Sequence, residues 1–279
     1  MTETPAPSNK RSSTAPSGAT EIQSAPEMPS RGRLWSEIAI VLGLSLGASA
    51  VYSIVSIINK LTREESLGDQ STSINTPLSP RPIFDLIYQL LGVGFALVPV
   101  ALVIFLLWDA SRPGLGKLHR LGIDGTAPWR DFGVGVGLAA VIGIPGIGVY
   151  LGGRALGITV NVVPTALDDY WWTIPVLILA AMRAGLVEEV IVIGYLFARL
   201  RDLGFGSWQI ILASALLRGS YHLYQGIGSF VGNVAMGIVF GWLYVRYGRL
   251  LPLVMAHILL DTAVFIGYPW AVATFPQLF

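Results

Sequence analysis

Five acidic and imidazole side chains lie in the apolar C-terminal half of this sequence. Glu188 and Glu189 are adjacent, His222 follows in a later apolar segment, and His257 precedes Asp261 by four residues. A carboxylate beside a neutral imidazole can hold and deprotonate a water molecule. A second imidazole can donate a hydrogen bond to a developing oxyanion, and a carboxylate behind it can orient the ring. If these residues meet, they supply the groups that peptide hydrolysis needs.

The same residues could also hold a metal ion. Histidine and carboxylate ligands with one open position are typical of catalytic zinc, so Glu188, His222 and His257 could bind one Zn²⁺. Each group also has a purely structural interpretation. The glutamates could reach the end of their helix, His222 could lie at the membrane interface, and His257 with Asp261, on one helix face, could form a hydrogen-bonded pair between helices.

Signatures of other hydrolases are missing from the sequence. There is no His-Glu-x-x-His and no Gly-x-Ser-x-Gly, and the only Gly-Asp pair lies outside the long apolar segments. The chain has 0 Cys, which excludes a thiolate nucleophile, a disulfide framework and a zinc finger. These absences favour hydrolysis by an activated water.

The composition predicts that membrane helices position these residues. Hydrophobic residues make up 53% of the 279 residues, and charged residues make up 13%, about half of the roughly 25% typical of soluble domains. The mean hydropathy is +0.63 and the net charge is +1. This balance excludes a cytosolic enzyme, a nucleic-acid binder with a basic face, and a disordered protein. We therefore expect an all-α, polytopic membrane helix bundle in contact with the lipid bilayer.

Seven segments are apolar over a length that approaches the roughly 20 residues needed to cross a bilayer. An eighth span is the alternative. The expected spans are Ile38–Asn59, Leu86–Trp108, Phe132–Gly153, Trp171–Leu200, Ser207–Tyr224, Ile227–Tyr247 and Leu250–Tyr268. The last four contain the ionisable residues.

Three regions follow from this pattern. Residues 1–33 are rich in Ser, Thr, Pro, Ala and Gly and are expected to form a disordered cytoplasmic tail. Residues 34–165 would hold the first three spans and their loops, and residues 166–279 would form the catalytic core. Lys and Arg number twelve on the side of the tail and four on the other side, which predicts a cytoplasmic N-terminus in an integral, multi-pass cell-membrane protein.

Residues 170–265 resemble the CAAX-protease and bacteriocin-processing family (CPBP, or Abi) of intramembrane proteases, which includes the type II CAAX prenyl endopeptidases. The family carries Glu-Glu-x-x-x-Arg, Phe-x-x-x-His and His-x-x-x-Asn/Asp on separate membrane helices. Here these motifs match Glu188-Glu189, His222, and His257 with Asp261. The resemblance implies that Glu188 and His222 activate the water. It also implies that His257 and Asp261 stabilise the oxyanion or orient the site, and that Glu189 supports them.

The sequence departs from the family pattern at two positions. Ile193 stands where the family has arginine, and Arg218 stands where it has phenylalanine. We therefore predict that the positive charge has moved to another helix and that Arg218 pairs with Glu189. Arg183, on the helix of the glutamates, is the rival partner.

The expected function is an intramembrane endopeptidase, of metallo- or glutamate type, that acts near the membrane surface on a hydrophobic or lipidated peptide. Prenylated substrates are implied only by the resemblance, and processing of other membrane peptides is an equal alternative. A non-catalytic immunity or partner-binding protein on the same fold is the second hypothesis, favoured by Ile193. A proton-coupled transporter is the third, since buried Glu, His and Asp also serve proton transfer.

Overall fold

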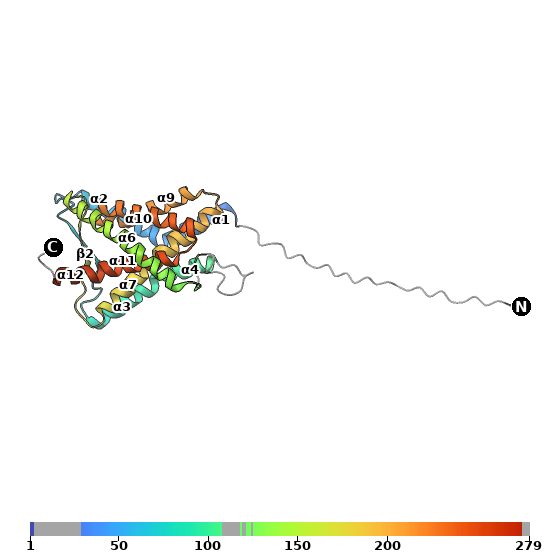
Figure 1. Cartoon of the computed structure of the whole chain (residues 1–279), viewed down its shortest axis with the longest axis horizontal. Helices are drawn as coiled ribbons and strands as arrows, with labels where there is room; N and C mark the ends of the chain where they lie inside the picture. The colour runs from blue at the N-terminus through green and yellow to red at the C-terminus, as the bar shows by residue number, and fades with distance from the viewer. Residues whose placement is uncertain (3–28, 108–117, 119–120, 124, 275–279) are drawn as a thin grey trace.

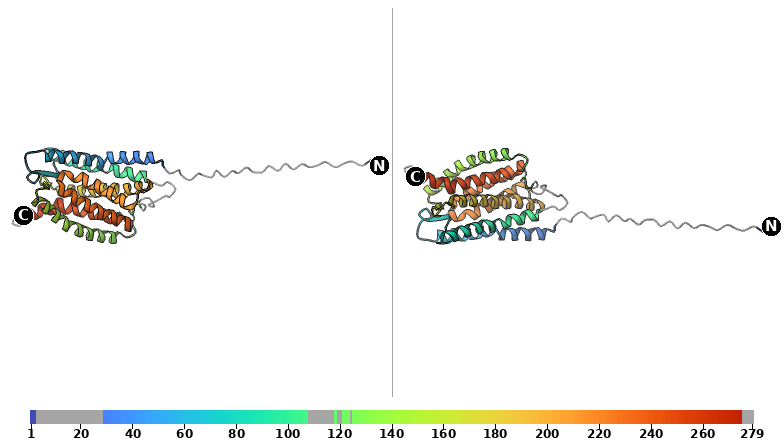
Figure 2. Two further views of the ribbon diagram at one scale, coloured as in Figure 1. Left: turned by 90° about the horizontal axis from the view of Figure 1, so that it is seen from above. Right: turned by 90° about the horizontal axis from the view of Figure 1, so that it is seen from below.

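The computed structural model describes residues 1–2, 29–107, 118, 121–123 and 125–274. Within these residues, helices lie side by side along the long axis of the molecule (Figures 1 and 2). Two short strands lie at one end of this bundle, which we call the strand end, and α1 begins at the other, which we call the α1 end. The all-α bundle expected from the composition agrees with this architecture.

The helices follow the chain in a simple order. The N-terminal part contains α1 (Arg31–Gly43), α2 (Leu46–Leu61), α3 (Pro82–Ala96), α4 (Val98–Leu106) and α6 (Pro128–Ala155). The C-terminal part contains α7 (Thr173–Glu188), the π-helix η1 (Glu189–Tyr195), α8 (Leu196–Asp202), α9 (Ser207–His222), the 3-10 turn η2 (Leu223–Gln225), α10 (Ile227–Tyr247), α11 (Leu251–Thr262), the π-helix η3 (Ala263–Gly267) and α12 (Tyr268–Thr274). Proline in the first turn starts α3, α4, α6 and α11, where its missing N–H costs nothing.

Four helical segments of the described chain are long and apolar enough to cross a membrane. They are Pro82–Leu106, Pro128–Ala155, Ile227–Tyr247 and Leu251–Thr274, and α1 with α2 adds a fifth if the two helices, bent by 58°, form one span. The expected seven or eight spans are therefore not confirmed. Two of the expected spans correspond to the continuous run α7–η1–α8 and to α9, which carry the buried residues Glu188, Glu189 and Arg218.

Two features of the N-terminal half differ from the expectation. Residues 31–33, assigned above to the tail, already belong to α1, because the hydroxyl of Ser30 accepts a hydrogen bond from the Arg33 amide and caps the helix. Residues 3–28 of the expected tail lie outside the described residues. The structure also contains two short strands, β1 (Ser71–Asn75) and β2 (Asn161–Thr165), which pair in parallel.

Small residues of α10 allow α9 and α10 to pack closely together. A Cβ atom added to Gly237 would lie 2.8 Å from the Cα atom of Ala215, and one added to Gly241 would meet Phe197 and Ile211. These glycines therefore bring α10 against neighbouring helices of the same chain. This close approach fixes the position of α9, which carries Arg218 and His222.

Replacing Gly237 with alanine is expected to destabilise the bundle by about 1–3 kcal/mol, because the added methyl group overlaps backbone that cannot move aside. Thermal unfolding in detergent would show this as a lowered Tm. The matched control is Gly232→Ala, whose Cβ would meet only Val149 Cγ1 at 3.5 Å, an ordinary contact. Equal Tm values for the two variants would contradict the packing described here.

Candidate active site

The glutamates lie at a change of helix type within a continuous helical run from Thr173 to Asp202. Glu188 is the last residue of α7, and Glu189 is the first residue of η1. All seven residues of η1 are buried. π-Helical turns inside α-helices occur frequently at functional sites. Here the π-helical segment begins at Glu189, immediately after Glu188.

α9 and α11 bring the remaining groups to the glutamates. α9 presents Arg218 and His222 one helical turn apart, and α11 presents His257 and Asp261 with the same spacing. Gly185 allows α11 to approach α7 closely, because a Cβ there would lie 2.8 Å from Ile258 Cγ1. Three segments that are distant in the sequence thus meet at one level of the bundle.

A fully buried group of charges forms the deepest part of this site. Oε1 of Glu189 lies 2.6 Å from Nη2 of Arg218 and 2.6 Å from Nδ1 of His257. The side chains of Glu189 and Arg218 have no exposed surface. The ion pair between Arg218 and Glu189 that the sequence predicted is therefore confirmed, and it forms between two different helices.

The guanidinium of Arg218 makes further contacts besides the ion pair with Glu189. Its guanidinium lies 5.6 Å from the ring centroid of Phe240 and 3.9 Å, through Nη1, from Sδ of Met236. The same Nη1 lies 3.6 Å from Oε2 of Glu188. Ile193, at the position of the family arginine, is fully buried in the apolar core. The rival partner Arg183 makes no hydrogen bond or ion pair with either glutamate among the described residues.

Glu188 is surrounded by an aromatic hydroxyl and two imidazoles. The hydroxyl of Tyr221 donates a 2.8 Å hydrogen bond to Oε2 of Glu188. The same oxygen lies 3.7 Å from Nε2 of His222 and 3.9 Å from Nε2 of His257. Both distances are longer than a direct hydrogen bond. Glu188 is therefore close to both imidazole rings but is not hydrogen-bonded to either of them.

Tyr221 is the residue that the sequence reasoning missed. It is adjacent to His222, and neighbours on a helix point about 100° apart, so its position in the sequence did not place it in the same site. Both side chains nevertheless reach Glu188, because the surface of α9 that lies between the directions of Tyr221 and His222 is turned toward Glu188 at the end of α7. A polar aromatic residue in an otherwise apolar helix beside a candidate histidine was the available signal.

The group that orients His257 differs from the expected one. Asp261 Oδ2 lies 3.7 Å from Nε2 of His257, too far for a hydrogen bond. Glu189 makes the hydrogen bond instead, at the opposite ring nitrogen. With Nδ1 donating to Glu189, the Nε2 atom of His257 faces Glu188 and Asp261.

His222 has unsatisfied polar atoms at the site. Within the described residues, neither of its ring nitrogens has a hydrogen-bond partner, although both are shielded from solvent. A buried polar atom without a partner costs about 1–3 kcal/mol. Its ring nitrogens are therefore available to a water molecule or a substrate.

The donor atoms are a poor fit to a zinc ion. Tetrahedral zinc with nitrogen and oxygen ligands at about 2.0–2.1 Å holds those ligands about 3.3 Å apart. The corresponding distances from Glu188 Oε2 to His222 and His257 are 3.7 and 3.9 Å. In the part of the chain that the structure describes, no group of three or more His, Cys, Asp or Glu side chains is arranged to hold a metal ion.

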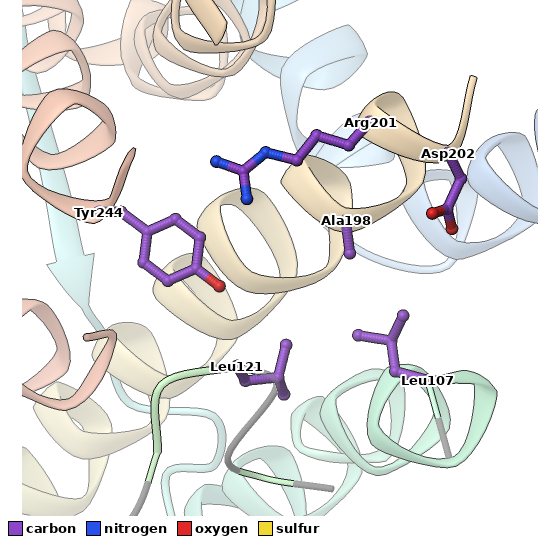
Figure 3. Close-up of a pocket in the computed structure, with 6 residues that line it drawn as sticks. All are labelled: Leu107, Leu121, Ala198, Arg201, Asp202 and Tyr244. Atoms are coloured by element: carbon purple, nitrogen blue, oxygen red, sulfur yellow. The ribbon is translucent and has the colours of Figure 1, made fainter. Parts of the chain in front are cut away.

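A separate cavity of about 220 Å³ lies at the α1 end (Figure 3). Its lining residues are Leu107, Leu121, Ala198, Arg201, Asp202 and Tyr244. None of them is a residue that the sequence predicted for catalysis. The candidate active site is therefore defined by its converging side chains and not by this cavity.

Comparison with known proteins identifies the segment that carries this site. Residues 170–263 match the family model of the Rce1-like type II CAAX prenyl endopeptidases. This match confirms the family resemblance over the segment from the beginning of α7 to the beginning of η3, which contains every residue of the candidate site. Neither the curated proteins nor the solved structures include a match to the chain.

Proposed function

We propose that this chain is an intramembrane endopeptidase whose Glu188 and His222 activate the attacking water. The observation that carries the proposal is the position of Glu188 Oε2, 3.7 Å from His222 Nε2 and 3.9 Å from His257 Nε2. The three residues come from α7, α9 and α11. The similarity of residues 170–263 to a protease family supports the reaction class.

The first step would be addition of water to the peptide carbonyl. A water molecule held against Glu188 and His222 loses one proton to the Glu188 carboxylate as its oxygen bonds to the carbonyl carbon. The carbonyl oxygen then carries the negative charge. Nε2 of His257 faces this region, and when protonated it can donate a hydrogen bond to that oxygen.

The second step would break the peptide bond. Glu188 returns its proton to the amide nitrogen, the carbon–nitrogen bond breaks, and the products are a carboxyl group and a free amine. Glu189 holds the ring of His257 through Nδ1, at 2.6 Å, and Arg218 neutralises Glu189. Glu189 and Arg218 thus act as positioning residues, while Asp261 supplies a further carboxylate near Nε2 of His257.

The substrate class rests on the environment and the family. Exposed apolar side chains of α3 and α6 face outward from the bundle, as expected for lipid contact. A hydrophobic or lipidated peptide would reach the site from such surroundings. A panel of fluorogenic peptides, with and without an attached prenyl group, tests this with protein purified in detergent. Cleavage of at least one peptide is expected, and inertness toward every peptide would favour the non-catalytic alternative.

Replacing Tyr221 with phenylalanine is expected to lower kcat roughly tenfold, because a hydrogen bond to a charged group is worth about 1.5–3 kcal/mol. The fold should persist, since only a hydroxyl is removed. Tyr224→Phe is the matched control, because its hydroxyl accepts from Gln225 at 2.8 Å and makes no hydrogen bond to Glu188. A kcat in Tyr221→Phe equal to that of the control would show that this hydroxyl does not position Glu188.

Removal of metal separates the two forms of the mechanism. Glu188, His222 and His257 would be the ligands if the protein uses zinc, and the ion would then polarise the carbonyl. Because their donor atoms are too widely spaced for such an ion, we expect activity to survive dialysis against a strong chelator. Loss of activity that is restored by added Zn²⁺, with one bound zinc per chain by elemental analysis, would establish the metal form instead.

A further inference from the structure

The candidate site extends from the middle of a membrane-spanning helix, where Arg218 contacts Met236, to one end of that helix, where His222 lies. α10, from Ile227 to Tyr247, is one of the four membrane-length segments and is about 31 Å long. His222 precedes its first residue by only the turn η2 and Gly226. Gly226 forms an isolated bridge with Thr159, next to β2. His222 therefore lies at the strand end of this span, and the α1 end is about 30 Å away.

Exposure within the site increases toward the strand end. The side chains of Arg218 and Glu189 are 0% exposed, that of Glu188 is 11% exposed, and those of His222 and Asp261 are 19% and 23% exposed. On α9, the step from Arg218 to His222 is one turn toward the strand end. On α11, the step from His257 to Asp261 is one turn in the same direction, toward Phe265, whose cluster packs against Ile74 of β1. The more exposed groups of the site thus lie on its strand-end side.

The two ends of the bundle differ in charge. Among the described residues, the α1 end carries seven arginines and three acidic residues: Arg31, Arg33, Arg130, Arg199, Arg201, Arg246 and Arg249, with Glu37, Asp131 and Asp202. The strand end carries the basic residues Lys60, Arg63, Arg81 and Arg154, and the acidic residues Glu64, Glu65, Asp69, Asp85, Asp168 and Asp169. Basic residues that flank membrane spans accumulate on the cytoplasmic side. The α1 end is therefore the cytoplasmic end.

We infer that the candidate site opens on the extracytoplasmic face of the membrane, so that its substrate is a peptide segment presented from that face. Three independent observations point the same way: the level of His222 along α10, the direction in which exposure increases, and the placement of the basic residues. The substrate class rests on the proposed peptidase function, whereas the direction of opening does not. A peptide confined to the cytoplasm would meet the basic end, about 20 Å from Glu188 along the helical run that ends at Asp202.

Single cysteines can test this directly, because the chain contains 0 Cys. His222→Cys and Asp261→Cys report on the site, Ser66→Cys reports on the strand end, and Ser207→Cys reports on the α1 end. Ser66 and Ser207 are both exposed. Each full-length variant would be treated in intact spheroplasts with a membrane-impermeant maleimide and then analysed by mass shift. A second sample would be treated after permeabilisation.

We expect Ser66→Cys and both site variants to be modified in intact spheroplasts, and Ser207→Cys only after permeabilisation. Site variants that react only after permeabilisation, or not at all, would overturn the inference, as would modification of Ser207→Cys in intact spheroplasts. Elution from a sizing column at the position of the unmodified protein shows that each variant is folded. Two site variants are used so that the test still gives a result if one of them does not fold. Labelling does not require peptide cleavage, so a protein without peptidase activity would still report the direction of opening.

Discussion

Glutamine in place of Glu188 is expected to abolish peptide hydrolysis, with a loss in kcat of at least about a hundredfold, the lower limit for a general base. The amide has nearly the shape of the carboxylate, and its oxygen can still accept the hydrogen bond from Tyr221 that Glu188 accepts at 2.8 Å. What it cannot do is take a proton from water at neutral pH. The measurement is the initial rate of cleavage of the best peptide of the panel by purified protein.

Glu37→Gln is the matched control for this variant. Glu37 is also partly buried, and it also accepts a hydrogen bond from a tyrosine hydroxyl, that of Tyr195 at 3.0 Å. It lies on α1, where it pairs with Arg199, away from the candidate site. Its replacement should lower the Tm and leave kcat within about threefold of the parent, a difference of under 1 kcal/mol in barrier height. Substantial cleavage by Glu188→Gln would remove the proposed role of this residue.

Replacing Arg218 with alanine is expected to destabilise the protein by about 3–5 kcal/mol, because removal of one partner leaves a buried charge uncompensated. Arg218 and Glu189 are both fully buried and 2.6 Å apart. Chemical unfolding in detergent, followed by tryptophan fluorescence, measures the loss. The loss should far exceed that of an exposed ion pair, which is worth about 0–1 kcal/mol.

The double variant Arg218→Ala with Glu189→Ala shows whether the two residues act as a pair. We expect a loss smaller than the sum of the two single losses by about 1–3 kcal/mol, since removing both charges leaves neither of them unpaired. Arg183→Ala with Glu189→Ala is the control, and its losses should add, because Arg183 makes no ion pair with Glu189 among the described residues. Additive losses for Arg218 and Glu189 would contradict the pairing.

Much of this molecule follows from the residue order alone. The scarcity of charge and the long apolar segments predicted a helical membrane bundle, because only a helix satisfies its own backbone hydrogen bonds over each such segment. The cost of burying charge made each ionisable residue in these segments a candidate for the site. Isoleucine at position 193, where the family has arginine, together with arginine at position 218, where it has phenylalanine, predicted the pair of Arg218 with Glu189 that the structure contains.

The tertiary structure decided the features that depend on contacts between distant segments. Tyr221 reaches Glu188, and Glu189 rather than Asp261 orients His257, because both depend on how α9 and α11 are rotated against α7. The parallel pairing of β1 with β2 joins two loops that are far apart in the sequence, with α3, α4 and α6 among the elements between them. Local periodicity specifies which face of a helix is apolar, but it does not specify which neighbour that face meets. The level of the site along the bundle, and hence the side on which it opens, is set by that packing.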